Sequence, residues 1–280
     1  MRAPVDTIAA PLFPTKLPWV NTSGSHPLGR TLKGAPHWPQ AGRQASILQR
    51  GKPMLVEFWD FCRPNSIRTL PYVKAWHERY ADAGLRVIGV HCPGFDPSRD
   101  EGAVRDAVAR LEIAHPVLID SQFELWREYD NRGWPARYLF DGGARLFDYH
   151  YGEGGYEETE LAIQELLEVE REPITPLRPE DAPDARLVRQ TPDQIGAWSG
   201  PYEAGGVWVV LAPSGAHPLG RRQAGTVTVN GGHSGGITLT VEHPGAYQLV
   251  EHSRHTEAVL DLDVGSSVEC LATCFTPGVA

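Results

Sequence analysis

The sequence predicts an α/β domain with a mixed central sheet flanked by helices, followed by an all-β sandwich or jelly-roll domain. Between residues 52 and 170, short apolar runs alternate with amphipathic segments, which is typical of a largely parallel sheet. From residue 196 onward, short β-rich runs are separated by Gly, Pro, Ser and Asn clusters, as in β-sandwiches. The stretch between them is rich in proline and charge, which is the composition of a linker. The predicted parts are an extended arm (1–44), the α/β domain (45–170), the linker (171–195) and the β domain (196–280).

Composition excludes several function classes. The chain has 280 residues, 41% of them hydrophobic and 22% charged, enough for two compact domains. Its 26 Lys and Arg residues against 35 Asp and Glu residues give a net charge of -9, which repels phosphate backbones, so nucleic acid is not expected as a partner. No apolar run approaches the roughly 18 residues of a membrane span, so none is expected.

Cysteine usage and the N-terminus bear on the compartment. Four cysteines are too few for a disulfide-built scaffold. The first twenty residues contain no apolar run of signal-peptide length. We therefore expect a cytoplasmic protein, or an extracytoplasmic one if the N-terminus is truncated.

The first half of the α/β domain contains two strands and two helices in alternation. The run MLVEFW (54–59) predicts a buried strand. In residues 66–84, apolar residues recur at intervals of three and four, which predicts a helix kinked by Pro71. Residues 85–91 predict a second buried strand, and residues 101–112 predict a second helix.

The second half of this domain predicts a different succession. Residues 116–120 form a short apolar strand, followed by a helical turn at 125–129. Residues 136–152 then indicate a hairpin that turns at Gly142 and Gly143. A helix at 157–170 completes the domain.

Three segments carry a resemblance to a known family: FWDFCRPNSIRTLPYVKAW (58–76), VIGVHCPGF (87–95) and NRGWPARYLFD (131–141). Together they resemble the thioredoxin-like, TlpA/ResA-type tail of membrane-anchored thiol-disulfide interchange proteins. The resemblance implies a thioredoxin fold, with a cis-proline at Pro135, after Trp134, that faces the active-site turn and an extended substrate strand.

The β domain carries a weaker resemblance. The segment AYQLVEHSRHTEAVLDLDV (246–264) and the closing residues 275–278 are similar to the carbohydrate-binding-like β-sandwich that follows the thioredoxin unit in the same proteins. This resemblance gives no information on whether the β domain binds sugar.

The active-site motif departs from the family pattern. The family has a Ser or Thr and then Cys-x-x-Cys after Phe-Trp; aligned without gaps, Cys62 takes the Ser/Thr place, Arg63 the first Cys and Ser66 the second. Disulfide exchange needs an attacking thiolate at the helix N-terminus and a resolving thiol one turn later. The usual dithiol cycle is therefore excluded unless another thiol substitutes. Because the motif is degenerate, resemblance to the family does not imply the family's activity.

The candidate catalytic residues are Cys62, Arg63, Asp60 and Cys92. Cys62 either fills a small-residue position, acts as a reactive single thiol beside Arg63, or contacts a ligand. Cys92 follows the neighbouring parallel strand, so it lies beyond the same sheet edge as Cys62; the two either pair as an unconventional disulfide or are unrelated. Asp60 is either a proton acceptor or a solvated or helix-capping carboxylate.

The candidate substrate-binding residues surround the same edge: Trp59, Ser66, His91, Trp134 and Pro135. The Ser66 hydroxyl is expected to accept a free N–H at the start of its helix. His91, Cys92 and Cys62 supply three metal ligands with no fourth in view, so neither a metal nor a cofactor is expected.

Two further cysteines lie near the C-terminus. Cys270 and Cys274 are four residues apart on a predicted strand, which places them about 13 Å apart on one face. They cannot pair while that strand is regular, and packing accounts for them best.

Three functions compete. The first is a thioredoxin-family oxidoreductase that uses Cys62 alone, with Cys92 as a second thiol, on thiol, disulfide or peroxide substrates. The second is a redox-inactive binding module that holds an extended peptide in the cis-proline groove, or a ligand on the β-sandwich. The third is a small-molecule enzyme with unconventional chemistry at Cys62, Arg63 and Asp60.

Overall fold

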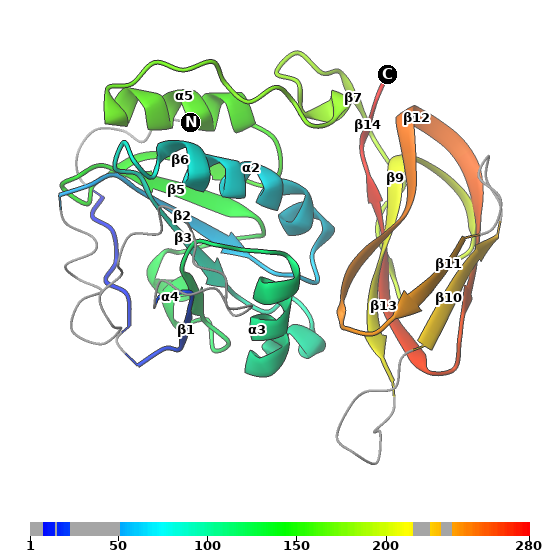
Figure 1. Ribbon diagram of the computed structural model, residues 1–280. Helices are drawn as coiled ribbons and strands as arrows, with labels where there is room; N and C mark the ends of the chain where they lie inside the picture. Colours follow the sequence, from blue (N-terminus) through cyan, green and yellow to red (C-terminus); the bar gives the residue numbers. More distant parts are fainter. Residues whose placement is uncertain (1–7, 15, 23–50, 215–224, 231–236) are drawn as a thin grey trace. The chain divides into compact units, whose positions relative to one another are not determined.

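The computed structural model describes residues 8–14, 16–22, 51–214, 225–230 and 237–280 (Figure 1). The chain divides into two compact units: the first comprises Met1–Asp60 and Asn65–Thr175, and the second comprises Pro176–Ala280 together with the short segment Phe61–Pro64. The first is an α/β unit and the second is an all-β unit, so the predicted fold class is confirmed. No helix in these ranges is long and apolar enough to cross a membrane.

The first unit is built on a six-stranded mixed sheet of order β1-β4-β3-β2-β5-β6. Its three central strands are parallel and almost fully buried, as their unbroken apolar runs require. The strands are β1 (Trp19–Val20), β2 (Met54–Trp59), β3 (Arg86–His91), β4 (Val117–Ile119), β5 (Ala136–Phe140) and β6 (Leu146–Tyr151).

Helices cover the sheet on both faces because its strand residues alternate between two apolar clusters. Leu55 on β2 packs in a cluster with residues of α2 and α5, which lie side by side in Figure 1. Its neighbour Val56 packs in the opposite cluster with Leu125 of α4 and Phe13 of the N-terminal arm. The helices are α2 (Pro64–Tyr80), η1 (Asp96–Arg99), α3 (Glu101–Arg110), α4 (Glu124–Glu128) and α5 (Tyr156–Leu167).

The predicted hairpin forms, and it turns at Gly142 and Gly143 as predicted: the Ala144 N–H donates to the Asp141 carbonyl at 3.0 Å. β5 and β6 pair antiparallel, and Ala144, directly after the two glycines, has left-handed backbone at φ 60°. The Asp141 carboxylate accepts the N–H groups of Gly143 and Arg145, both at 2.8 Å, and so holds the turn.

Part of the predicted N-terminal arm is a strand of the first unit. β1 pairs antiparallel with β4, and Ala9 forms an isolated bridge with Arg145. Residues 1–7, 15 and 23–44 of that arm lie outside the described residues. The arm therefore supplies an edge strand that its sequence, which lacks any periodic pattern, did not predict.

The second unit is an all-antiparallel structure with a six-stranded sheet of order β11-β10-β12-β9-β13-β8 and a two-stranded sheet of β14 and β7. Its core is aliphatic and aromatic, including Val207, Leu211 and Phe275. The strands are β7 (Leu187–Val188), β8 (Gln194–Ile195), β9 (Gly200–Pro213), β10 (Gly225–Asn230), β11 (Ile237–Val241), β12 (Gly245–Val264), β13 (Val268–Thr276) and β14 (Gly278–Val279).

Two details of this unit differ from the predictions. β7 and β8 lie within the predicted linker but pair with β14 and β13, so the unit begins well before residue 196. A register shift in β13 between Cys270 and Ala272 breaks the strand's alternation. Cys270 packs on the same core as Phe275, although residues five positions apart face opposite sides of a regular strand. Cys270 and Cys274 therefore do not share one face as a regular strand would require.

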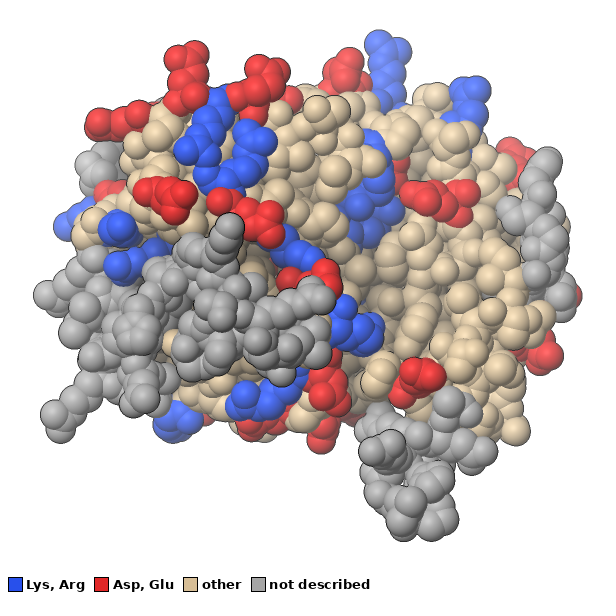
Figure 2. Space-filling model, in the orientation of Figure 1, with Lys and Arg blue, Asp and Glu red and all other residues tan. Residues whose placement is uncertain are grey.

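Charge on the molecular surface is mixed. On the face drawn in Figure 2, Lys and Arg side chains of the first unit are interspersed with Asp and Glu side chains. The visible face of the second unit is mostly uncharged. This distribution is in line with the net negative charge of the chain.

Candidate functional site

The candidate site lies where β2 and β3 end. These strands are parallel neighbours, as predicted, and Trp59 stands opposite His91 in the register. The Cys92 N–H donates to the Trp59 carbonyl at 3.0 Å, and the rings of Trp59 and His91 meet edge to face with centroids 5.1 Å apart. The carboxyl ends of parallel strands meet at one edge, so the segments that follow Trp59 and His91 start side by side.

Asp60 is a buried anchor, whereas the sequence left open a proton acceptor and a solvated or helix-capping carboxylate. Its side chain is fully buried. One oxygen, Oδ2, accepts the Gly94 N–H at 2.7 Å, and the other, Oδ1, lies 3.4 Å from Nε2 of His91. Asp60 thus links the end of β2 to the loop after β3, so its carboxylate has a structural role.

Ser66 lies in the first turn of α2, as predicted, but its hydroxyl has a different partner. The Oγ atom accepts the backbone N–H of Asp60 at 3.2 Å, and the side chain is fully buried. Arg63, half-buried, directly precedes α2, which begins at Pro64. The place of the family's resolving cysteine is therefore occupied by a hydroxyl that fixes the loop between β2 and α2.

Cys92 is held as a protonated thiol. Its Sγ donates to Oδ2 of Asp120 at 3.6 Å, and the side chain is fully buried. Burial, with the Asp120 carboxylate, raises the pKa of the Cys92 thiol well above 9. Since the thiolate is the nucleophile, Cys92 is poorly suited to attack a disulfide at neutral pH.

The carboxylate of Asp120 is also engaged by the next helix. It accepts the backbone N–H groups of Glu124 at 2.7 Å and Trp126 at 2.9 Å at the start of α4. Cys62 and Cys92 are both buried, and neither is in a disulfide in the structure.

Trp134 and Pro135 are joined by a cis peptide bond. The Trp134 indole N–H donates to the Cys92 carbonyl at 3.0 Å, which fixes this loop next to the end of β3. Trp134 remains partly exposed and packs on Trp126, with ring centroids 4.5 Å apart, and on Phe123 at 6.4 Å. The loop thus presents an aromatic surface beside Pro135.

Sequence reasoning missed a buried charged pair below the site. Glu57 on β2 stands opposite Arg137 on β5, and both side chains are almost fully buried. Burial raises the pKa of Glu57 to about 8, although the charge of Arg137 opposes this shift. The signal was a lone Glu in the apolar run MLVEFW and a lone Arg in ARYLF.

The two cysteines of the second unit have strongly raised pKa values. Burial raises the pKa of Cys270 to about 11. Burial and the nearby Asp193 carboxylate raise the pKa of Cys274 to about 12. Within the described ranges, His, Cys, Asp and Glu form no cluster of three or more able to hold a metal ion.

Comparison with known proteins shows what this chain is similar to. The chain is similar to Protein DipZ of Mycobacterium tuberculosis, 31% identical over 207 residues, which are 70% of this chain and 28% of that protein. It is also similar to the thiol-disulfide oxidoreductase YkuV of Bacillus subtilis, 28% identical over 136 residues, which are 49% of this chain and 91% of YkuV. The chain thus spans little more than a quarter of the length of DipZ. No family model matches it.

Among solved structures, the chain resembles a thiol-disulfide isomerase from Corynebacterium glutamicum. The match has a TM-score of 0.44 and 21% identity, and it covers 56% of this chain and 96% of that one.

Proposed function

The first unit of this chain is a thioredoxin-like domain of the TlpA/ResA type, and on that premise we propose that the chain performs single-cysteine thiol redox chemistry at Cys62. Its relatives include proteins named thiol-disulfide oxidoreductases, so its family is one of thiol redox proteins. The substrates we propose are thiols and disulfides.

The observation that carries the proposal is the state of the other three thiols. Cys92, Cys270 and Cys274 all have pKa values raised by burial, which keeps them protonated at neutral pH. Cys62 is also fully buried, but it lies next to Arg63 and two residues before Pro64, where α2 begins. A guanidinium and a helix N-terminus both stabilise a thiolate. Cys62 is therefore the thiol best placed to react.

The proposed cycle has two exchange steps. The Cys62 thiolate attacks one sulfur of a low-molecular-weight disulfide, forms a mixed disulfide with it, and releases the other half as a thiolate. An external thiol then attacks the bound half and forms a new disulfide with it. Cys62 leaves as a thiolate, ready for the next cycle, and the thiolate released in the first step takes up the proton that the external thiol lost. A reducing compartment such as the cytoplasm supplies that external thiol.

Burial sets a condition on this chemistry. Cys62 is buried in the structure, so a disulfide reaches it only when the segment that carries it opens. The reaction rate then depends on the fraction of open molecules as well as on the thiolate fraction.

A second function, binding without redox chemistry, is favoured by the loop around Pro135. The hydrogen bond from Trp134 to Cys92 and the contact of Trp134 with Trp126 support this function, because they hold a partly exposed aromatic surface next to the buried Pro135. An extended peptide would bind there through backbone groups. The third function, an enzyme that uses Asp60, is disfavoured because its carboxylate is buried and accepts the Gly94 N–H.

Reaction with a disulfide reagent tests the first function. We expect 4,4′-dithiodipyridine to modify Cys62 of the intact chain faster than the other three cysteines. The rate should rise with pH around a midpoint below the free-thiol value of about 8.5. Mass spectrometry of the mixed disulfide locates the modified residue.

Matched serine variants provide the control. Cys62→Ser should remove the fast phase, whereas Cys92→Ser, at a buried thiol bonded to Asp120, should keep it. If Cys62 reacts no faster than Cys92 in the intact chain, the single-cysteine function is wrong and the binding function replaces it.

A further inference from the structure

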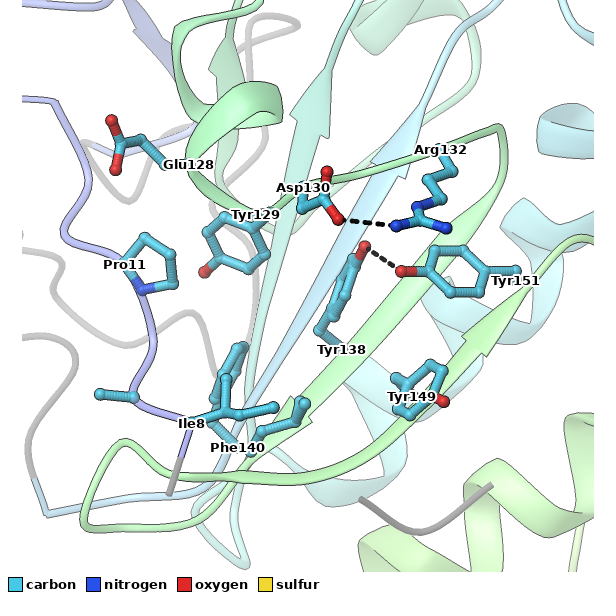
Figure 3. A pocket seen from close by; sticks show the side chains of 12 residues that line it. Ile8, Pro11, Glu128, Tyr129, Asp130, Arg132, Tyr138, Phe140, Tyr149 and Tyr151 are labelled. Carbon is cyan, nitrogen blue, oxygen red and sulfur yellow. Dashed lines mark hydrogen bonds and ion pairs between the residues drawn. The ribbon is translucent and has the colours of Figure 1, made fainter. Parts of the chain in front are cut away.

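The first unit contains a pocket of about 530 Å³ that is separate from the residues of the candidate site. It lies on the face of the β5–β6 hairpin, and the N-terminal arm and the end of α4 contribute to its lining (Figure 3). This volume is within the range that small-molecule sites occupy, roughly 300–1,000 Å³.

The walls of the pocket are mainly aromatic. Tyr138 and Phe140 alternate along β5, and Tyr149 and Tyr151 alternate along β6, with Tyr138 directly opposite Tyr149. Residues two apart on a strand share a face, so the four rings form one surface. Tyr138 and Tyr151 meet edge to face, with centroids 5.9 Å apart, and Tyr151 is 44% exposed. Such a surface favours contact with a flat ring.

Tyr129 adds a buried polar atom to this lining. Its side chain is only 8% exposed, and its hydroxyl has no hydrogen-bond partner among the described residues. Figure 3 shows the hydroxyl directed toward Pro11, which also lines the pocket. A buried hydroxyl without a partner is costly, and an oxygen of a bound molecule would remove that cost.

The charges of the lining are compensated or point outward. Arg132 donates to Asp130 at 3.0 Å, and both side chains are largely exposed at the mouth. Figure 3 shows the carboxylate of Glu128 directed away from Tyr129. The Tyr138 hydroxyl donates to Asn131 at 2.9 Å and lies 3.1 Å from the Tyr151 hydroxyl. Among the described residues, the aromatic walls offer an ionic ligand no unpaired opposite charge, so a neutral ligand fits better.

We propose that this pocket binds a neutral, planar aromatic molecule that carries a hydroxyl or carbonyl oxygen. The ring lies against the tyrosines of β5 and β6, and the oxygen exchanges a hydrogen bond with the Tyr129 hydroxyl. Both a donor and an acceptor suit this site because a phenol hydroxyl can serve as either.

Ligand-observed NMR on the intact chain tests the proposal with three probes of one shape: 2-naphthol, naphthalene and 2-naphthoate. We expect 2-naphthol to bind most tightly and 2-naphthoate most weakly. Tyr129→Phe keeps the ring and removes only the hydroxyl. It should weaken the binding of 2-naphthol by about two- to tenfold, the value of one hydrogen bond, and leave the binding of naphthalene unchanged.

Two further variants complete the design. Tyr151→Ala, at an exposed position of the pocket wall, should weaken the binding of both neutral probes. Tyr247→Phe, a matched removal of a hydroxyl in the second unit, should change the affinity of neither probe. The proposal is overturned if 2-naphthol shows no saturable binding, if 2-naphthoate binds as tightly, or if Tyr129→Phe leaves the preference for 2-naphthol over naphthalene intact.

Discussion

The double variant Arg63→Cys, Ser66→Cys is expected to reduce insulin disulfides at least about 100-fold faster than the native chain. Position 63 directly precedes α2, where the helix dipole lowers a thiol's pKa, and position 66 lies in the first turn of that helix. A sulfur introduced at position 66 can attack a mixed disulfide at position 63 within the same molecule. Such intramolecular attack has a far higher effective concentration than an external thiol.

The single variants are the controls for this gain. Arg63→Cys supplies an attacking thiol without a resolving one, and Ser66→Cys supplies the reverse, so each should stay well below the double variant. Mass spectrometry should show that the double variant loses two hydrogens on oxidation. If that disulfide forms and insulin reduction stays at the native rate, the proposed thioredoxin-type substrate groove beside Pro135 does not function in this chain.

Glu57 is expected to make the first unit less stable as pH rises from about 4.5 to 8. Burial raises its folded-state pKa to about 8 from the ordinary value of 4.5, so within this window the folded chain holds a proton that the unfolded chain has released. The stabilisation is present in full below pH 4.5 and is lost as the pH rises to about 8. The slope is about 1.4 kcal/mol per pH unit.

Urea unfolding followed by tryptophan fluorescence at a series of pH values measures this slope. Glu57→Gln keeps the size of the side chain but carries no proton to lose, so its stability should depend less on pH across the window. Burial lowers the pKa of His115 well below 6.5, which acts in the opposite direction in both proteins. The difference between the native chain and Glu57→Gln therefore isolates Glu57.

An exposed glutamate provides the matched control. Glu78→Gln, on the exposed side of α2, should follow the native pH profile. Parallel profiles for the native chain and Glu57→Gln would mean that Glu57 keeps an ordinary pKa in the folded protein.

The main strands and helices could be predicted because local pattern governs them. MLVEFW and the run before His91 are continuous apolar segments, and both form buried parallel strands. The predicted departure at positions 63 and 66 also comes from the sequence alone, and it excludes the usual dithiol cycle unless another thiol substitutes.

Local pattern failed where distant groups decide a conformation. The β1 strand has only two residues and no periodic signal, and it forms because β4 offers an open edge. The register shift in β13 is set by pairing with β9, which lies about sixty positions earlier in the chain.

The sequence by itself determined the fold class and the order of the main elements, and it predicted that Arg63 and Ser66 stand in the places of the two motif cysteines. Only the tertiary structure decided that Asp60 is a buried anchor, that the Cys92 thiol donates to Asp120, and that burial raises the pKa of Glu57 to about 8. It also assembled the aromatic pocket from three separate segments. The physical reason is that hydrophobic periodicity is local, whereas desolvation and charge at a side chain depend on groups that folding brings from far along the chain.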